Sequence, residues 1–252
     1  MLNIIIPMAG RGSRFAEAGY EVPKPLIPIN GKPMIHWVVK NIRPSQPHRF
    51  VFICLADHLA TYPEIESTLR QECPECEIVL VTEVTEGAAC TVLLAKELIN
   101  NANPLMIANS DQLVELPIDD YLATAVDQIA DGLIMTFWSD HPKWSYCRMD
   151  GPKVTEVVEK KVVSNEATVG IYNFAHGADF VRAAESMIAQ NLRVNGEFYV
   201  APAYNQLIAE GKTIVTNETG KEYDGMHGLG TPEDLDLFLK SKFFRAYCRT
   251  EE

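Results

Sequence analysis

Two glycines and an arginine directly follow the first apolar segment of the chain, and these residue types could bind phosphate. The segment Leu2–Pro7 is followed by Met8-Ala9-Gly10-Arg11-Gly12-Ser13-Arg14-Phe15. Gly10 and Gly12 let the backbone approach a ligand closely and point its N–H groups at it. The guanidinium of Arg14 is a planar fork that suits phosphate oxygens. An ordinary turn between a strand and a helix also carries glycines, so the loop alone leaves both interpretations open.

Lys24 provides a second cation in a proline-rich segment after this loop. Pro23 and Pro25 fix φ on either side of Lys24 and keep the backbone extended, so the lysine is suited to contact a second phosphate group. Two familiar phosphate loops do not fit. Phe15 stands where the fingerprint G-x-G-x-x-G needs glycine, and no Gly-Lys-Ser/Thr follows. The proline-rich segment also predicts that no helix begins directly after the loop.

Short apolar runs alternate with amphipathic stretches in the first half of the chain. This alternation predicts an α/β fold with a mostly parallel sheet that helices cover on both faces. In such sheets ligands bind beyond the carboxyl ends of the strands, where the glycine loop lies. The predicted strands are Leu2–Pro7, Phe50–Leu55, Glu77–Thr82, Pro104–Asn109 and Gly132–Trp138, and the predicted helices are Met34–Ile42, Ala56–Glu72, Ala88–Asn100 and Ile118–Ile129.

After Trp138 the predicted strands follow one another more closely, and no linker rich in Gly, Ser or Pro divides the chain. We therefore expect one domain over residues 1–252, with a nucleotide-binding half at 1–138 and an acceptor-binding half at 139–252. The last helix is predicted to begin at Thr231, which suits the N-cap, with Pro232 at the first helical position and Asp234 able to reach back.

The charge balance limits the classes of partner. The 252 residues include 22 Lys and Arg against 34 Asp and Glu, a formal net charge of −12, so broad nucleic-acid binding is not expected. The most apolar run, residues 50–56, is far shorter than the ~20 residues that a membrane-spanning helix needs. The N-terminus lacks the positive segment of a signal peptide, so we expect a cytoplasmic protein without a membrane partner.

Three motifs together resemble the sugar-phosphate nucleotidyltransferase family, the nucleoside-diphosphate-sugar pyrophosphorylases. They are G-x-G-x-R-F at 10–15, P-K-P-L-I at 23–27 and G-K-P-M-I at 31–35, and the resemblance covers nearly the whole chain. It implies a single-domain Rossmann-like fold similar to GT-A, with a mixed, mostly parallel central sheet. It also implies transfer of an NMP group from an NTP to a phosphorylated acceptor such as a sugar 1-phosphate, with release of pyrophosphate, for cell-surface polysaccharide precursors.

The resemblance also implies roles for the residues of the nucleotide-binding half. Arg14 and Lys24 would be the catalytic cations that hold the triphosphate. Asp111 follows a strand as the family's Mg²⁺-binding aspartate does, which implies Mg²⁺ as cofactor. The residues implied to bind the nucleotide are Ala9, Gly10, Gly12 and, against the nucleobase, Gly87.

Further matches imply how the acceptor is bound. Glu159-Lys160-Lys161 resembles the family's Glu-Lys-Pro, whose lysine binds the substrate phosphate, although Lys161 replaces the proline. Gly170 resembles the glycine of a strand beside the sugar. Glu197 resembles an acidic residue near the acceptor.

Two departures from the family indicate a divergent branch. Many relatives carry a second Mg²⁺-binding aspartate as D-x-G-T, where this chain has Gly228-Leu229-Gly230-Thr231. Asp224 is the candidate replacement, and His227 the next, although neither position matches. Ser145 and Tyr146 stand near the position of a Tyr-Gly pair that contacts the acceptor in many relatives, so the acceptor need not be an ordinary sugar 1-phosphate.

Two other functions stay open. Glycosyltransferases of similar fold use a finished nucleotide sugar and usually carry Asp-x-Asp, whereas this chain has Asn109-Ser110-Asp111. The missing second aspartate leaves a catalytically silent nucleotide-binding regulatory subunit as the other alternative. The expected partners are an NTP and a small phosphorylated acceptor, while the nucleobase, the acceptor and formation of a homo-oligomer are left open.

Overall fold

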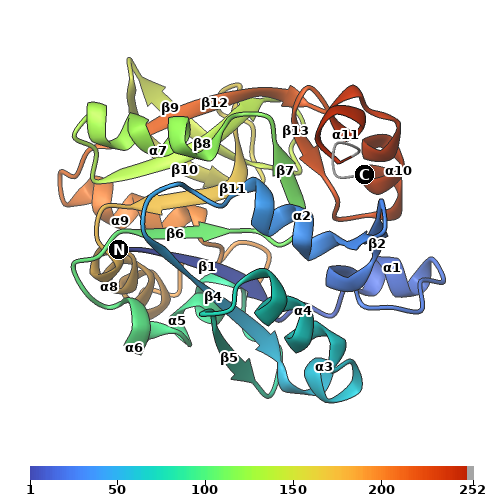
Figure 1. Ribbon diagram of the computed structural model, residues 1–252. Coiled ribbons are helices and arrows are strands. Elements are labelled where there is room, and N and C mark those ends of the chain that lie inside the picture. Colours follow the sequence, from blue (N-terminus) through green and yellow to red (C-terminus); the bar gives the residue numbers. More distant parts are fainter. Residues whose placement is uncertain (249–252) are drawn as a thin grey trace.

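The computed structural model describes residues 1–248, and strands from both halves of the chain form one central sheet (Figure 1). Four strands of the first half are parallel neighbours in the order β5-β4-β1-β6. Their bounds are β1 (Leu2–Met8), β4 (His48–Leu55), β5 (Glu77–Val81) and β6 (Leu105–Ala108). The predicted α/β fold is confirmed, and the carboxyl ends of these strands meet at one edge of the sheet.

The rest of the sheet is mixed. β11 (Glu166–Phe174) lies antiparallel between β6 and β8 (Gly132–Trp138), and β12 (Ile214–Glu222) is parallel to β8. After these two antiparallel steps β8 runs in the same direction as β6, although the two strands are not neighbours. The chain reverses direction in the short turn between β9 (Ser145–Asp150) and β10 (Lys153–Glu159), which pair antiparallel, and β11 keeps the reversed direction.

The remaining strands continue the central sheet, except for one pair that forms a small sheet of its own. They are the hairpin β9 (Ser145–Asp150) and β10 (Lys153–Glu159), the pair β7 (Gln112–Val114) and β13 (Gly225–Gly228), and the separate pair β2 (Pro28–Ile29) and β3 (Lys32–Pro33).

Helices cover both faces of the sheet, as the alternation predicted. One face carries α1 (Ser13–Glu17), α2 (Met34–Asn41), α3 (Ala56–Thr61), α4 (Glu64–Glu72), α7 (Ile118–Asp127), α10 (Pro232–Lys240) and α11 (Lys242–Tyr247). The other face carries α5 (Ala88–Leu93), α6 (Lys96–Ile99), α8 (Gly177–Ala189) and α9 (Tyr204–Ala209). The 3-10 turns η1 (Lys24–Leu26) and η2 (Ala201–Ala203) complete the helical elements within residues 1–248.

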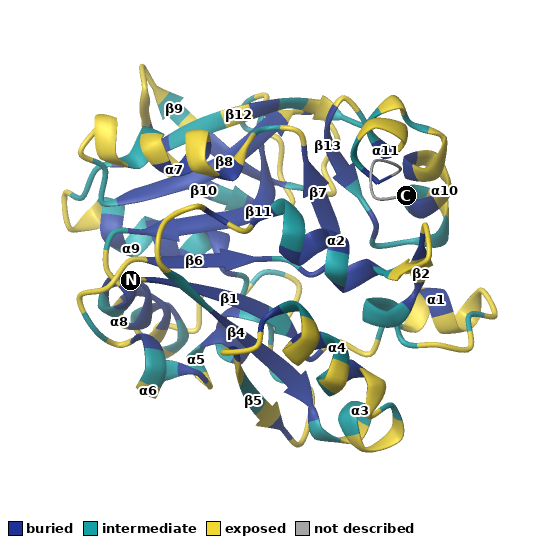
Figure 2. Cartoon of the chain, viewed as in Figure 1, coloured by how far each residue is buried: buried dark blue, intermediate teal, exposed yellow. Residues whose placement is uncertain are grey.

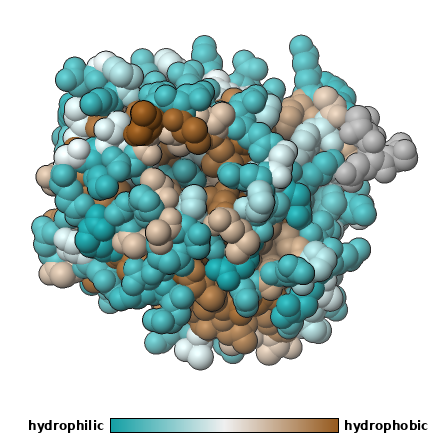
Figure 3. Space-filling model, turned by 60° about the vertical axis from the view of Figure 1, so that its left-hand side comes forward, coloured by the Kyte–Doolittle hydropathy of each residue, from teal (hydrophilic) through white to brown (hydrophobic). Residues whose placement is uncertain are grey.

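The side chains of β1 explain why the sheet has two covered faces. Ile4 and Ile6 belong to one apolar core and Ile5 to the other, and all three are fully buried. Figure 2 shows β1 in the colour of buried residues. Burying an isoleucine side chain contributes about 1.5–3 kcal/mol. The face in Figure 3 is largely hydrophilic, with apolar atoms gathered in a few patches. Within residues 1–248, no helix is both long and apolar enough to cross a bilayer.

Three local predictions were wrong. The helix expected at 56–72 is two helices, α3 and α4, because Pro63 disfavours the helical region for Tyr62, whose φ and ψ are −129° and 76°. The helix expected at 88–100 is likewise divided into α5 and α6. The short helix α1 begins directly after the glycine loop, because Gly12 adopts the left-handed conformation (φ 63°) and turns the backbone into it.

Candidate active site

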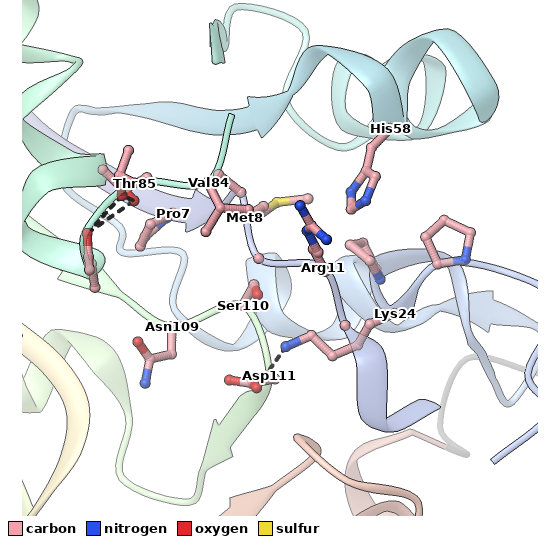
Figure 4. Close-up of a pocket in the computed structure, with 18 of the residues that line it drawn as sticks. Pro7, Met8, Arg11, Lys24, His58, Val84, Thr85, Asn109, Ser110 and Asp111 are labelled. Carbon is pink, nitrogen blue, oxygen red and sulfur yellow. Dashed lines mark hydrogen bonds and ion pairs between the residues drawn. The ribbon is translucent and has the colours of Figure 1, made fainter. Parts of the chain in front are cut away.

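A cavity of about 390 Å³ lies beyond the carboxyl ends of β1, β5 and β6 (Figure 4). This first cavity is at the edge where ligands bind in parallel sheets. Eight of the residues singled out from the sequence line it, from the glycine loop, the proline segment and the loops after β5 and β6. Seven of these are predicted site residues, Ala9, Gly10, Gly12, Lys24, Gly87, Asp111 and Glu197, and the eighth is Asn109 of the segment before Asp111.

The structure brings Lys24 and Asp111 together across 87 positions of sequence. The Lys24 Nζ donates to Asp111 Oδ2 at 2.8 Å, as Figure 4 shows, and the two side chains are 20% and 24% exposed. The 3-10 turn η1 begins at Lys24, and the residue before it, Pro23, has an extended backbone. The predicted phosphate-binding cation and the predicted metal-binding carboxylate therefore form one ion pair on the wall of the cavity.

The two arginines of the glycine loop are placed differently. Arg11 lines the first cavity (Figure 4), whereas Arg14 is exposed on α1 and is not among the residues that line it. Sequence reasoning did not select Arg11, although the same fork argument applies to a residue between Gly10 and Gly12. His58, also on the cavity wall, follows the carboxyl end of β4 and could have been found from that position.

Gly87 joins the loop after β5 to the second half of the chain. Its φ is 133°, and a Cβ built on it would lie 2.5 Å from the carbonyl oxygen of Phe198. The Ala89 N–H donates to the Phe198 carbonyl at 3.0 Å, and the Phe198 N–H donates to the Glu86 carbonyl at 2.9 Å. This close approach requires glycine and places Glu197 on the wall of the first cavity.

A second cavity of about 210 Å³ adjoins the first, and both are lined by Ala88 and Asn109. A Cβ built on Gly170 (φ 102°) would lie 2.1 Å from Asn109 Nδ2, so only glycine lets the Asn109 side chain lie here. The second cavity is lined by the predicted acceptor residues Glu159, Lys160 and Gly170, and by Gln112, Lys143, Trp144, Ser145, Thr168, Tyr172 and Tyr199, among others.

Glu159 is the buried carboxylate of this second cavity. The Ser145 hydroxyl donates a short hydrogen bond to its Oε2, and Lys160 Nζ lies 3.6 Å from its Oε1. Burial raises the pKa of Glu159, while Ser145 and Lys160 act to lower it. Its side chain is 4% exposed. The carboxylate therefore pays a desolvation cost that an additional cation in the cavity would offset.

Lys160 adopts a left-handed backbone conformation (φ 54°) where β10 ends. Its N–H donates to the Trp144 carbonyl at 3.0 Å, which fixes this turn against the start of β9. Lys160 lines the second cavity, and Lys161 is not among the lining residues.

The segment that replaces D-x-G-T lies against Asp111. The Leu229 N–H donates to the Asp111 carbonyl at 2.8 Å, and a Cβ built on Gly230 would lie 3.1 Å from Asp111 Oδ2. A Cβ built on Gly228 would lie 3.6 Å from Oδ2 of Asp234. Asp234 Oδ1 accepts from the Tyr223 hydroxyl at 2.7 Å.

The structure does not bring Asp224 into this arrangement. Its N–H and carbonyl both pair with Lys221 in the turn between β12 and β13, and it is not among the residues that line the two cavities. The buried His227 instead pairs through Nε2 with Glu115 Oε1 at 2.8 Å. Among the residues described, the carboxylate beside the position of the missing aspartate is that of Asp234, which like Asp224 does not line either cavity and which the sequence assigned only to the helix cap.

The donor set around Asp111 fits a Mg²⁺ ion. Residues 1–248 contain no group of three or more His, Cys, Asp and Glu side chains that could hold a metal. Mg²⁺ nevertheless binds through one or two carboxylates when substrate phosphates and water supply the other oxygens. Asp111 is partly exposed at the cavity and already pairs with an ammonium, so its carboxylate can accept a cation here.

Comparison with known proteins gives the family. The family model described as "Nucleotidyl transferase" matches residues 3–199. The chain is 25% identical over 249 residues to the bifunctional protein GlmU of Thermotoga sp. (strain RQ2), which covers 96% of this chain and 52% of that protein. It is 27% identical over 182 residues to the mannose-1-phosphate guanylyltransferase catalytic subunit beta of Danio rerio, covering 69% of this chain and 50% of that protein.

Solved structures agree with this comparison. A nucleoside-diphosphate-sugar pyrophosphorylase from Vibrio cholerae RC9 superposes with a TM-score of 0.79 at 25% identity, covering 94% of this chain and 100% of that chain. A UDP-glucose pyrophosphorylase in complex with UDP-glucose has the same fold, with a TM-score of 0.75 at 17% identity and full coverage of both chains. The chain spans about half the length of the curated relatives it matches. The match over residues 3–199 establishes that the chain belongs to the nucleotidyl transferase family.

Proposed function

We propose that this protein transfers an NMP group from an NTP to a small phosphorylated acceptor and releases pyrophosphate. The observation that carries this proposal is the Lys24–Asp111 pair on the wall of the first cavity, next to a second cavity that Lys160 lines. A cation and a carboxylate at this position suit a magnesium-bound triphosphate, and Lys160 suits the phosphate of the acceptor. The product would serve as a precursor of cell-surface polysaccharide, made in the cytoplasm.

The proposed reaction is a displacement at the α-phosphorus. An oxygen of the acceptor phosphate forms the new bond, and the bond to the oxygen that bridges to the β-phosphate breaks, so pyrophosphate leaves with the electron pair. The acceptor phosphate is already anionic at neutral pH, so no general base is required. Positioning and charge neutralisation therefore carry the catalysis.

Each cation has a proposed place in this reaction. Lys24 and Arg14 hold the triphosphate, and Lys160 holds the acceptor phosphate in line with it. Asp111 would hold a Mg²⁺ ion, which would supply neutralisation of phosphate charge. Gly10 and Gly12 let backbone N–H groups reach the phosphates, and Gly87 leaves room for the nucleobase.

Pyrophosphate release from each of the four common NTPs, with a panel of phosphorylated acceptors, tests this function. We expect release to depend on one NTP, one class of acceptor and Mg²⁺. A glycosyltransferase would instead release a nucleoside diphosphate from a nucleotide sugar. A silent regulatory subunit would bind a nucleotide and release neither product.

The two arginines of the glycine loop allow a matched test. We expect Arg14→Ala to lower activity by orders of magnitude without unfolding the protein, because Arg14 is exposed. Arg14→Lys should also be impaired, since a point charge cannot replace the guanidinium fork. Arg11→Ala is the comparison, because Arg11 lines the cavity. A loss confined to the Arg11 variant would transfer the proposed triphosphate role from Arg14 to Arg11.

A further inference from the structure

The second cavity contains a binding site for an ammonium group, which the chain's own Lys160 fills. Lys160 Nζ lies 3.6 Å from Glu159 Oε1 and donates to the Lys143 carbonyl at 3.4 Å. It also lies 5.3 Å from the centroid of the Tyr199 ring, within the range of a cation–π contact. A carboxylate, a carbonyl and an aromatic face are the groups that bind an alkylammonium ion.

A second ammonium group, that of Lys143, also contacts an aromatic ring of the second cavity. Lys143 Nζ lies 4.7 Å from the centroid of Trp144, and Trp144 and Tyr199 both line the second cavity. Lys143 is held there by an ion pair with Glu222 at 2.6 Å. Two of the aromatic walls of this cavity therefore already carry cations.

The proposed reaction places two demands on Lys160. Its ammonium has to hold the acceptor phosphate, yet in the structure it is the cation nearest the buried Glu159 carboxylate. If Lys160 turns to the phosphate, Glu159 keeps the Ser145 hydroxyl but loses its charged partner. A buried carboxylate without a cation is unfavourable, so a cation from the acceptor would restore the balance.

Resting on the proposed function, we propose that the acceptor is a phosphate ester that also carries an ammonium group. This ammonium takes the place of Lys160 Nζ between Glu159 and Tyr199, while Lys160 binds the phosphate of the same molecule. The Ser145 hydroxyl already occupies one oxygen of Glu159, so Oε1 is left for the cation. The polar walls of this cavity would otherwise suit a neutral polyhydroxyl acceptor, which the experiment includes as the rival.

Matched acceptors that differ only in the amine test this inference. One pair is 2-aminoethyl phosphate and 2-hydroxyethyl phosphate, and another is glucosamine 1-phosphate and glucose 1-phosphate. Calorimetry measures binding to the protein loaded with Mg²⁺ and a non-hydrolysable NTP analogue, and pyrophosphate release measures turnover. We expect the amine of at least one pair to bind about 10- to 150-fold more tightly than its hydroxyl partner, the range for one charge-assisted contact.

Glu159→Gln should remove this preference and leave affinity for the NTP analogue unchanged. Glutamine can still accept from Ser145, so the variant should fold, which circular dichroism and thermal unfolding check. Glu156→Gln is the matched control on β10, because Glu156 is half exposed and pairs with Arg148 outside the cavity. This control should keep the preference for the amine.

Two results would overturn the inference in distinguishable ways. Equal or tighter binding of the neutral members, with pyrophosphate release intact, would show that the cavity recognises hydroxyl groups and would leave the proposed function standing. Binding of the NTP analogue without pyrophosphate release from any of the four common NTPs, with either pair or with the whole panel of phosphorylated acceptors, would reject both the inference and the proposed function.

Discussion

Replacing Lys24 by methionine removes the cation that faces Asp111 while keeping an unbranched side chain that is one atom shorter. At 2.8 Å and an effective dielectric constant of about 20, Coulomb attraction amounts to ~6 kcal/mol before desolvation. Because about a fifth of each side chain is exposed, water screens the pair, and we expect a net contribution of ~1–2 kcal/mol. In the free protein this attraction competes with any metal ion for the same carboxylate.

The variant should therefore separate metal binding from catalysis. Affinity of the free protein for Mg²⁺, or for Mn²⁺ as a paramagnetic probe, should rise about 5- to 30-fold, the equivalent of ~1–2 kcal/mol. The value of kcat/KM should fall by about 10- to 150-fold, because a charge-assisted contact with the triphosphate is lost. Titration followed by electron paramagnetic resonance gives the first quantity, and pyrophosphate release gives the second.

Lys32→Met is the control, because Lys32 is an exposed lysine on β3. It should change neither quantity. A parallel loss of metal affinity and activity in Lys24→Met would refute the competition between ammonium and metal at Asp111. Near-normal turnover in Lys24→Met would refute the role of Lys24 at the triphosphate, whatever the metal affinity.

Three further predictions concern the glycine contact, the second carboxylate and the buried glutamate. Gly87→Ala should lower both melting temperature and NTP affinity, because its φ of 133° and a carbonyl 2.5 Å away leave no space for a methyl group; unchanged melting would contradict this. In Mg²⁺ titrations of the nucleotide-bound protein, Asp234→Asn should lower the affinity for Mg²⁺ more than Asp224→Asn does, since Asp234 lies beside Gly228. The reverse order would restore Asp224 as the replacement for the missing aspartate. Burial raises the pKa of Glu159 above 4.5, so ionisation of this carboxyl destabilises the folded protein. This destabilisation is absent below the pKa of the unfolded state and complete above the pKa of the folded state. The melting temperature of Glu159→Gln should therefore increase relative to that of the unmodified protein as pH rises from 4 to 7. A difference in melting temperature that stays constant with pH would refute the assignment.

Local sequence rules accounted for the elements of the first half of the sheet. Its short apolar runs are strands, of which β1, β4 and β6 are largely buried while the edge strand β5 exposes Leu80, and the start of the last helix is as predicted. There Thr231 accepts from the Asp234 N–H at 3.1 Å, and Pro232 occupies the first turn. These features depend on residues that are neighbours in the chain, whose steric and hydrogen-bonding preferences do not depend on the rest of the fold.

The order of the strands in the sheet could not be predicted from these local rules. β8 has the apolar pattern of the next parallel strand after β6, yet β11 enters between them. An apolar run indicates that a strand is buried on both faces, and β8 and β11 are both buried along almost their whole length, so the pattern does not tell which of them pairs with β6. Only the pairing of segments far apart in the chain distinguishes the two arrangements.

The sequence by itself determined the types of residue at the candidate site: a glycine loop with arginines, a lysine held between prolines, and a carboxylate after a strand. Only the tertiary structure decided which of them meet. Lys24 reaches Asp111 because the strands that carry their loops end at one edge of the sheet, while Asp224 stays in the turn between β12 and β13, outside both cavities, and Asp234 lies beside Gly228. Side-chain chemistry is a property of each residue, but a distance between residues separated by 87 positions depends on how the whole sheet is assembled.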